Sequence, residues 1–157
     1  MIQLEWNPNE RGGIPMKQEL LHEIRSQLSA LGLTAAASDK TDLTYDATLL
    51  DASFSTGKRT LRYEAMILLD ETDKQVRMYE KTTETGAGVS FGMSGETSFQ
   101  SGSTLMRKVK CVQYDPTGKA FEYNYDLGAI SKAVKSAALD HGWSFKTVIL
   151  KKNAMFR

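Results

Sequence analysis

The segment 59–81 (RTLRYEAMILLDETDKQVRMYEK) holds two runs of strand-forming residues around a polar cluster, and this pattern predicts a β-hairpin. Apolar side chains alternate along both runs, so the loop must have a length that brings the two apolar sets onto one face. A four-residue loop, 71–74, does this and sets Glu64 opposite Lys81, whereas a three-residue loop sets Glu64 opposite Glu80. Like charges directly opposite each other are unfavourable, so the four-residue loop is predicted.

The composition is that of an ordinary globular protein, since 41% of the 157 residues are hydrophobic and 25% are charged. A chain of this length can bury a sizeable core, and we expect one domain over residues 14–150. Residues 1–13 end in two glycines and are predicted to be a flexible or surface segment. Residues 151–157 are predicted to be a frayed C-terminal tail.

The formal net charge of +1 gives the chain no overall field that would attract nucleic acid or an anionic membrane. We therefore expect no nucleic-acid partner, and any site for an anion must be built locally. The expected partner is a small amphipathic or anionic ligand, or another protein.

Cys111 is the only cysteine, so an intramolecular disulfide is excluded and a reducing compartment is the simpler expectation. The first residues lack the basic region and apolar run of a signal peptide, although a chain that had lost a leader would look the same. No apolar run approaches the roughly 18 to 20 residues that span a bilayer. The sequence thus predicts a soluble, cytoplasmic protein without a transmembrane segment.

Two apolar stripes with helical spacing predict two helices. The first covers 15–31 and is expected to stop at Gly32, a residue type that often ends helices. The second is expected to begin after an N-cap at Asp126 and to end near His141 and Gly142. The residues of the two stripes are Leu20, Ile24, Leu28 and Leu31 in the first helix, and Leu127, Ile130, Val134, Ala137 and Ala138 in the second.

Alternating apolar residues also predict a strand over 43–54, with a bulge or burial of both faces, and a final strand over 143–150. Between 105 and 125 a second hairpin is predicted, because the sequence Asp-Pro-Thr-Gly at 115–118 is favourable turn chemistry. We therefore expect an α+β domain in the order α-β-β-β-loop-β-β-α-β. Its mainly antiparallel, bent sheet of about six strands, or partly closed barrel, carries the two helices on one face.

The segment 84–103 is rich in glycine, serine and threonine, shows no sustained period, and is predicted to be a loop. Gly86, Gly88 and Gly92 depart from the spacing of a dinucleotide-binding fingerprint, and the Gly-Lys-Ser/Thr of a P-loop is missing. Two interpretations remain. The segment is a mobile connection between strands, or it is a lid, because a solvated loop does not need apolar residues such as Phe91.

The second predicted hairpin has the residues of a binding site. If 116–117 is its two-residue loop, Lys108 lies opposite Tyr125 and Lys110 lies opposite Tyr123. Aromatic walls with two ammonium groups suit an anionic, partly apolar ligand, and a similar mixture occurs on platforms for single-stranded nucleic acid. The alternative is structural, with the lysine stems packed on the tyrosine rings and the charges in solvent.

We expect a non-enzymatic binding domain for a small amphipathic or anionic, lipid-like ligand. The pocket is expected between the sheet, the helices and the glycine-rich loop, with the candidate lining residues Lys108, Lys110, Tyr123, Tyr125 and Phe91. The alternative is a protein–protein interaction domain that uses a sheet edge or the 84–103 loop.

An enzyme is the third hypothesis. Neither a nucleophile with a base nor a cofactor motif is visible, and His22, His141 and Cys111 lack metal-ligand spacing, so no catalytic residue, metal or cofactor is predicted. Three carboxylates could still meet in space and perform acid–base chemistry, namely Glu80, Glu84 and Glu122.

Overall fold

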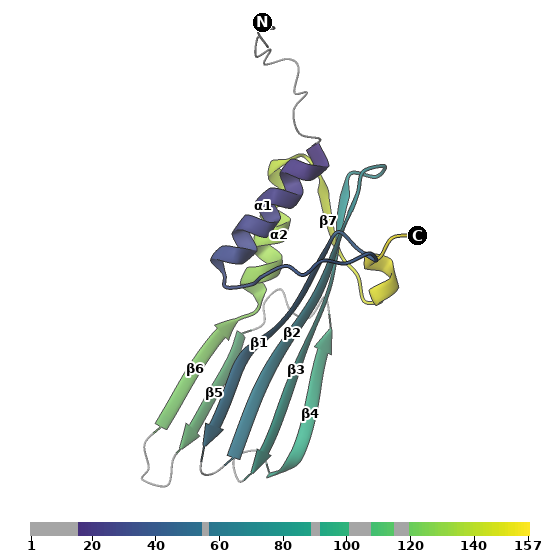
Figure 1. The fold of residues 1–157 in the computed structure, drawn as a ribbon. Coiled ribbons are helices and arrows are strands. Elements are labelled where there is room, and N and C mark those ends of the chain that lie inside the picture. The colour runs from purple at the N-terminus through teal and green to yellow at the C-terminus, as the bar shows by residue number, and fades with distance from the viewer. Residues whose placement is uncertain (1–15, 55–56, 89–91, 101–107, 115–119) are drawn as a thin grey trace, which may run out of the picture.

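The structure, a computed structural model, has two helices packed on one face of a five-stranded mixed sheet and a separate two-stranded hairpin (Figure 1). The predicted α+β fold is confirmed. The strand order of the larger sheet is β1-β2-β3-β4, and β7 pairs with β3 as well. The structure describes residues 16–54, 57–88, 92–100, 108–114 and 120–157, with side chains for 16–49, 60–86 and 126–157.

In this described part, the chain forms two α-helices, seven strands and one short 3₁₀ helix. All paired strands are antiparallel except β7, which runs parallel to β3. The elements are α1 (Met16–Ala30), β1 (Leu43–Phe54), β2 (Gly57–Asp70), β3 (Gln75–Gly88), β4 (Gly92–Gln100), β5 (Lys108–Tyr114), β6 (Ala120–Asp126), α2 (Gly128–Asp140), β7 (Ser144–Thr147) and η1 (Lys151–Ala154).

The strand number and order differ from the prediction because of the segment 84–103. Residues up to Gly88 extend β3, and Gly92–Gln100 form β4, which pairs antiparallel with β3. The expected loop is therefore largely strand, and the prediction of one sheet of about six strands is wrong. A ladder of backbone hydrogen bonds forms without alternating apolar side chains, which is why the composition concealed this strand.

The hairpin of β2 and β3 has the predicted register. Glu64 pairs with Lys81, as the four-residue loop 71–74 requires. Oδ1 of Asp70 accepts hydrogen bonds from the second and third N–H groups after it, at 3.0 and 3.2 Å. Lys74 closes the turn in the left-handed conformation, with φ of 45°. Turn chemistry and cross-strand charge therefore specify the same pairing.

The strand predicted over 43–54 is confirmed as β1, together with its bulge. The register between β1 and β2 shifts between Thr48 and Leu50. Before the bulge, Leu43 and Tyr45 are buried in the main core. An extra residue bends the strand at this point and re-aims the residues that follow.

Both helices end in the same way, at the glycines that the sequence indicated. Gly32 and Gly142 have φ of 86° and 74°, a backbone conformation that favours glycine. After α1, the N–H groups of Gly32 and Leu33 each donate at 2.9 Å to carbonyl groups of the last helical turn. After α2, Gly142 and Trp143 repeat the pattern at 3.0 and 2.9 Å, so each end is a Schellman motif.

Two details of the helix prediction are wrong. Leu31, expected in the stripe of the first helix, is 39% exposed because α1 ends at Ala30, and Leu33 is buried beyond the turn instead. Asp126 belongs to β6, so Leu127 occupies the N-cap position of α2 and makes no side-chain hydrogen bond there. The other stripe residues are confirmed as buried: Leu20, Ile24, Leu28, Leu127, Ile130, Val134, Ala137 and Ala138.

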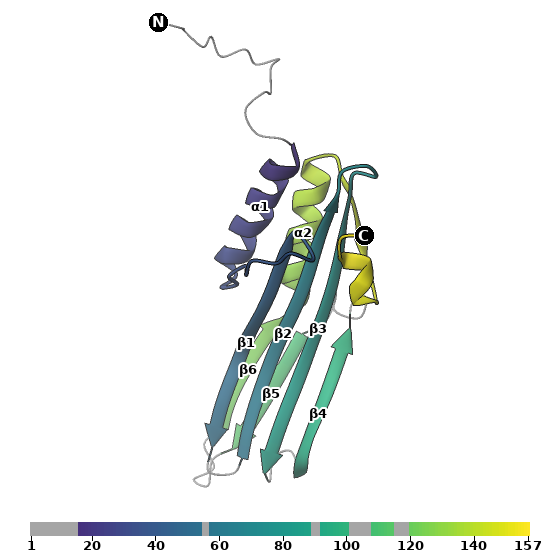
Figure 2. The same ribbon diagram turned by 45° about the vertical axis from the view of Figure 1, so that its right-hand side comes forward.

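The main core lies between the helices and alternate residues of β1, β2 and β3. Farther along the sheet the same face becomes polar, because Glu80 and Thr82 of β3 are fully buried close to Tyr63. In both ribbon views, the β5–β6 hairpin lies beyond the start of α2, on the helix side of the sheet (Figures 1 and 2).

The C-terminal residues pack on the opposite face of the sheet (Figure 2). The final strand is shorter than the predicted 143–150 and covers Ser144–Thr147. Residues 151–157, expected as a frayed tail, contain η1, and that expectation is wrong because Ala154 is fully buried. Apolar residues on both sides of η1 close over the sheet and form a second small cluster, Met66, Tyr79, Val148, Ala154 and Met155.

Candidate functional site

The structure does not describe the side chains of the five predicted ligand-binding residues. Phe91 lies outside the described residues. Lys108 and Lys110 are placed on β5, and Tyr123 and Tyr125 on β6, but their side chains are outside the described part. Ligand binding by these residues therefore stays a prediction.

The pairing that motivated this site is wrong by one residue. Lys108 pairs with Asp126, whereas Tyr125 pairs with Val109. The last pair before the turn is Tyr114 with Ala120, so the connection is longer than the predicted two residues. A slip of one residue exchanges the two sides of a strand, and the lysine positions no longer stand opposite the tyrosine positions. The position of Lys108 lies opposite that of Asp126, and the position of Lys110 lies opposite that of Asn124.

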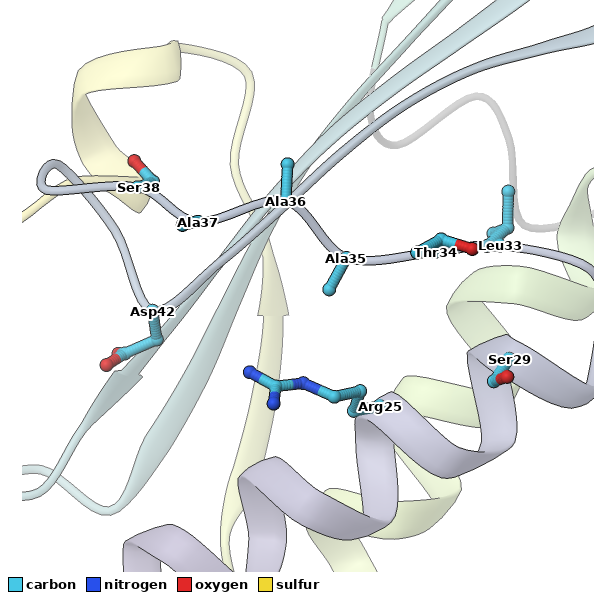
Figure 3. A pocket seen from close by; sticks show the side chains of 9 residues that line it. All are labelled: Arg25, Ser29, Leu33, Thr34, Ala35, Ala36, Ala37, Ser38 and Asp42. Atoms are coloured by element: carbon cyan, nitrogen blue, oxygen red, sulfur yellow. The ribbon is translucent and has the colours of Figure 1, made fainter.

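A pocket of about 510 Å³ lies between α1, the connection that follows it and the start of β1 (Figure 3). Its floor and walls come from a short stretch of sequence, because the chain leaves α1 at Gly32 and returns along the helix to reach β1. The lining residues are Arg25, Ser29, Leu33, Thr34, Ala35, Ala36, Ala37, Ser38 and Asp42.

Arg25 is the cation of this pocket. It follows the buried Ile24 in α1, and Figure 3 shows its side chain extending from the helix toward the connection and the start of β1. It forms neither an ion pair nor a hydrogen bond with any residue that the structure describes. Its guanidinium group therefore has its donors available for a ligand.

Asp42, the acidic residue of the lining, is already engaged. Its Oδ1 lies 3.1 Å from Nζ of Lys17, and its Oδ2 accepts a hydrogen bond of 2.8 Å from the N–H of Leu69. These contacts fix the carboxylate at the start of β1 and balance its charge. The local field in the pocket is consequently set by Arg25.

The remaining walls combine hydroxyl groups with methyl groups. Ser29, Thr34 and Ser38 supply hydroxyls, and three alanines supply small apolar surface. The N–H of Ala36 donates to the carbonyl of Thr44 at 2.8 Å, which ties the connection to β1. The N–H of Lys40 donates to Oγ of Ser38 at 3.1 Å. The first hydrogen bond attaches the connection to β1, and the second lies within the connection and supports its turn.

The pocket that residues 33–38 and Asp42 form with α1 was not predicted from the sequence. The available signal was weak: a run of small residues, Thr-Ala-Ala-Ala-Ser, after a helix that carries an arginine off its apolar stripe. Small side chains leave room for a pocket, but only the path of the chain brings them opposite Arg25.

Tyr45 lies buried close enough to Arg25 to respond to its charge. Burial raises the pKa of the Tyr45 phenol above its ordinary value, and the positive charge of Arg25 acts in the opposite direction. The phenol is therefore neutral at physiological pH. Its hydroxyl has no hydrogen-bond partner among the described residues.

A second charged pocket, of about 390 Å³, lies on the opposite face of the sheet beside η1. Arg62 donates two hydrogen bonds to the carboxylate of Asp46, and this contact lowers the pKa of Asp46. Burial, with a smaller contribution from Glu64, raises the pKa of Tyr79. Cations and anions alternate on this face, so the pocket has no single-sign field.

Metal-ligating side chains do not gather within the described ranges: no group of three or more His, Cys, Asp or Glu occurs there. His22 is exposed, whereas Nδ1 of His141 lies 3.1 Å from Oε2 of Glu23 and joins the two helices. None of the described helices has the length and apolar character needed to cross a membrane.

The arrangement around Arg25 can bind an anion, but it holds no nucleophile paired with a base. Comparisons with protein-family models, with curated proteins and with solved structures found no match. The chemistry of the pocket is therefore the basis on which a function can be inferred.

Proposed function

We propose that this chain is a non-enzymatic binding domain for a small anionic ligand, held in the pocket around Arg25. The observation that supports this most is a guanidinium group directed into a pocket of about 510 Å³ without an ion-pair partner among the described residues. A guanidinium matches the planar geometry of a carboxylate or the oxygens of a phosphate with two parallel hydrogen bonds. Pockets of this size are typical of small-molecule sites.

The hydroxyl and methyl groups indicate the shape of the ligand. Hydroxyls of Ser29, Thr34 and Ser38 can donate to further oxygens of the anion. The alanine methyls offer a small apolar surface, so the ligand has a charged head and a short apolar body. The ligand is thus the anionic, amphipathic molecule expected from the sequence, bound beside α1 and not on the second hairpin.

Backbone-amide NMR titration of the whole chain tests the proposal. The probes are inorganic phosphate, succinate and octanoate, which cover phosphate, carboxylate and amphipathic anions. At least one probe is expected to shift the amides of 33–38. Arg25→Gln should lower the affinity for this probe about 10- to 100-fold, the loss expected when one charge-assisted hydrogen-bonding contact is removed. Arg62→Gln is the matched control, because Arg62 is an exposed arginine already paired with Asp46.

Either of two results would overturn the proposal: no probe shifts the 33–38 amides, or Arg25→Gln binds as the wild type does. The double variant Lys108→Ala/Lys110→Ala separates this pocket from the site predicted on the second hairpin. If that variant loses the ligand while Arg25→Gln keeps it, the site is on the hairpin.

A second candidate function is association of two copies through sheet edges. Within the described strands, the outer edge of β1 is bridged only between Ala36 and Thr44. The path β1-β2-β3-β4 is antiparallel throughout, so its two outer strands run in opposite directions and β4 of one copy fits β1 of another. Sedimentation velocity over a range of concentrations tests this, with Thr48→Lys expected to abolish association, since edge lysines block pairing. A wild type that stays monomeric refutes it.

A further inference from the structure

The stretch 143–157 has a charge unlike that of the whole chain. It contains four basic residues and no acidic one, although the net charge of the chain is only +1. All four basic side chains are exposed: Lys146, Lys151, Lys152 and Arg157. The stretch itself is therefore basic, although acidic side chains of β1 and β2 line the pockets that it borders.

Two aliphatic side chains protrude beside these charges. Ile149 is 64% exposed and Leu150 is 53% exposed, at the bend between β7 and η1. They are followed directly by Lys151 and Lys152. We call these four residues, 149–152, the C-terminal tip. The two aliphatic side chains form a small apolar surface directly beside two lysines.

The C-terminal tip is fixed to the protein on both sides. Val148 is buried and its N–H donates to the carbonyl of Met78 at 2.9 Å. On the other side, the N–H of Asn153 donates to the carbonyl of Leu150 at 3.0 Å, and Ala154 is fully buried. The exposure of Ile149 and Leu150 therefore belongs to an anchored bend, and a partner would not have to order it first.

Neither lysine of the tip is held in a close ion pair, although Lys151 lies near enough to Asp46 for its charge to help lower the pKa of that carboxyl. The acidic side chains that share the neighbouring pocket with Lys151 are Asp46 and Glu64. Arg62 is bonded to Asp46 and lies 3.8 Å from Glu64, so both carboxylates already have a cation beside them. Neither lysine forms an ion pair with a residue in the described ranges.

We propose that the C-terminal tip docks on a membrane surface that carries anionic lipids. Ile149 and Leu150 enter the boundary between headgroups and acyl chains, and Lys151 and Lys152 meet the lipid phosphates. Each lysine near such a surface strengthens binding roughly five-fold. The aliphatic pair adds an apolar term, and the two together give weak, reversible, salt-sensitive attachment.

A membrane fits this surface better than an acidic protein does. Protein partners seat their anchor residues in pockets or grooves. Ile149 and Leu150 are exposed at adjacent positions and need no shaped pocket to enter the boundary between headgroups and acyl chains. A bend with two aliphatic residues followed by two lysines has its charges at the level of the headgroups when the aliphatic pair is inserted.

Co-sedimentation of the full chain with lipid vesicles tests the proposal. The wild type is expected to bind vesicles of phosphatidylcholine with phosphatidylserine at low salt, and to bind pure phosphatidylcholine at least about ten-fold more weakly. Ile149→Ser/Leu150→Ser and Lys151→Glu/Lys152→Glu should each lose most of the binding. Thermal unfolding of both variants should stay near that of the wild type, because the changed side chains are exposed.

Two control variants lie on α2. Leu139 is 56% exposed, so Leu139→Ser removes an equally exposed leucine, and Lys132→Glu/Lys135→Glu makes the same charge change at exposed lysines. Both should bind as the wild type does. The proposal fails if the wild type ignores anionic vesicles, or if the tip variants bind no worse than the controls. It also fails if the tip binds polyglutamate but no vesicle, which would indicate an acidic protein partner.

Discussion

The hydroxyl of Tyr63 donates a hydrogen bond of 2.7 Å to Oε1 of Glu80, and both side chains are fully buried. Glu80 stands opposite Ala65 on the side of the sheet that forms the main core. A carboxylate in such a place costs free energy unless donors satisfy it. Tyr63 supplies one of these donors, so this pair marks the point where the apolar face of the sheet becomes polar.

We predict that Tyr63→Phe lowers the free energy of unfolding by about 1 to 3 kcal/mol, the range for removing one hydrogen bond to a buried carboxylate. Urea denaturation at neutral pH measures the change. Tyr79→Phe is the control, because Tyr79 is also buried but lies on the opposite face, away from Glu80. Equal losses in the two variants would show that the hydrogen bond to Glu80 does not contribute to the free energy of unfolding.

We predict that Tyr45→Phe is as stable as the wild type at neutral pH, or more stable by up to about 1 kcal/mol. The Tyr45 hydroxyl is buried and has no partner among the described residues, so its removal relieves a desolvation cost. Urea denaturation checks this as well. A clear loss of stability would mean that the hydroxyl is bonded in solution.

The same tyrosine should limit stability at alkaline pH. Burial raises the pKa of Tyr45 in the folded state, so above the unfolded pKa of about 10 the unfolded chain loses the proton first. Unfolding is then favoured more as pH rises. Thermal melting from pH 9 to about 11 should fall less steeply for Tyr45→Phe than for the wild type. Parallel curves would contradict this assignment.

The contact between Arg62 and Asp46 predicts a small loss of stability in acid. The hydrogen bonds from Arg62 lower the pKa of Asp46 in the folded state. This contribution is present above the unfolded pKa of about 3.9 and is lost as pH falls through the lower folded value. Asp46→Asn should remove that part of the acid dependence. The effect is small because both side chains are about half exposed. If stability falls with decreasing pH in the same way for Asp46→Asn and the wild type, solvent screens the pair completely.

The glycines that end the helices should be needed for their backbone conformation alone. A Cβ atom at Gly32 or Gly142 would meet nothing within 4 Å, yet both φ values are positive. Gly32→Ala and Gly142→Ala should therefore each cost about 1 to 2 kcal/mol, from the left-handed strain of an L-residue. Asparagine should cost less at both positions. Chemical denaturation measures the series, and equal losses for alanine and asparagine would contradict this explanation.

The central hairpin could be predicted from sequence because independent signals agreed. The alternation of apolar residues, the polar loop and the pair Glu64–Lys81 all require the same register. The helix ends were equally accessible, since glycine at Gly32 and Gly142 follows an apolar stripe directly. Local chemistry specifies these features, and no distant contact is needed.

Features that depend on contacts between residues far apart in the sequence could not be predicted in the same way. The second hairpin has no cleanly apolar face in the predicted register, so nothing in its sequence corrected a shift of one residue. β4 is recognisable only by its pairing with β3, and η1 only by the cluster that buries Ala154. The pocket at Arg25 depends on the return of the chain along α1, which no spacing of residues encodes.

One edge of β3 is completed from two separate parts of the chain, and this has a consequence for how the protein is made. The β4 segment follows β3 in the sequence and pairs with its second half. The first half of β3 pairs with β7, beginning with Gln75 and Ser144, and β7 comes only after β4, β5, β6 and α2. During synthesis, strands that are adjacent in sequence can pair early. Residues 75–78 of β3 stay unpaired on this edge until α2 and then β7 have been synthesised. A nascent chain that stalls before Ser144 would expose that edge to other strands, so the last strand also acts as protection against misassembly.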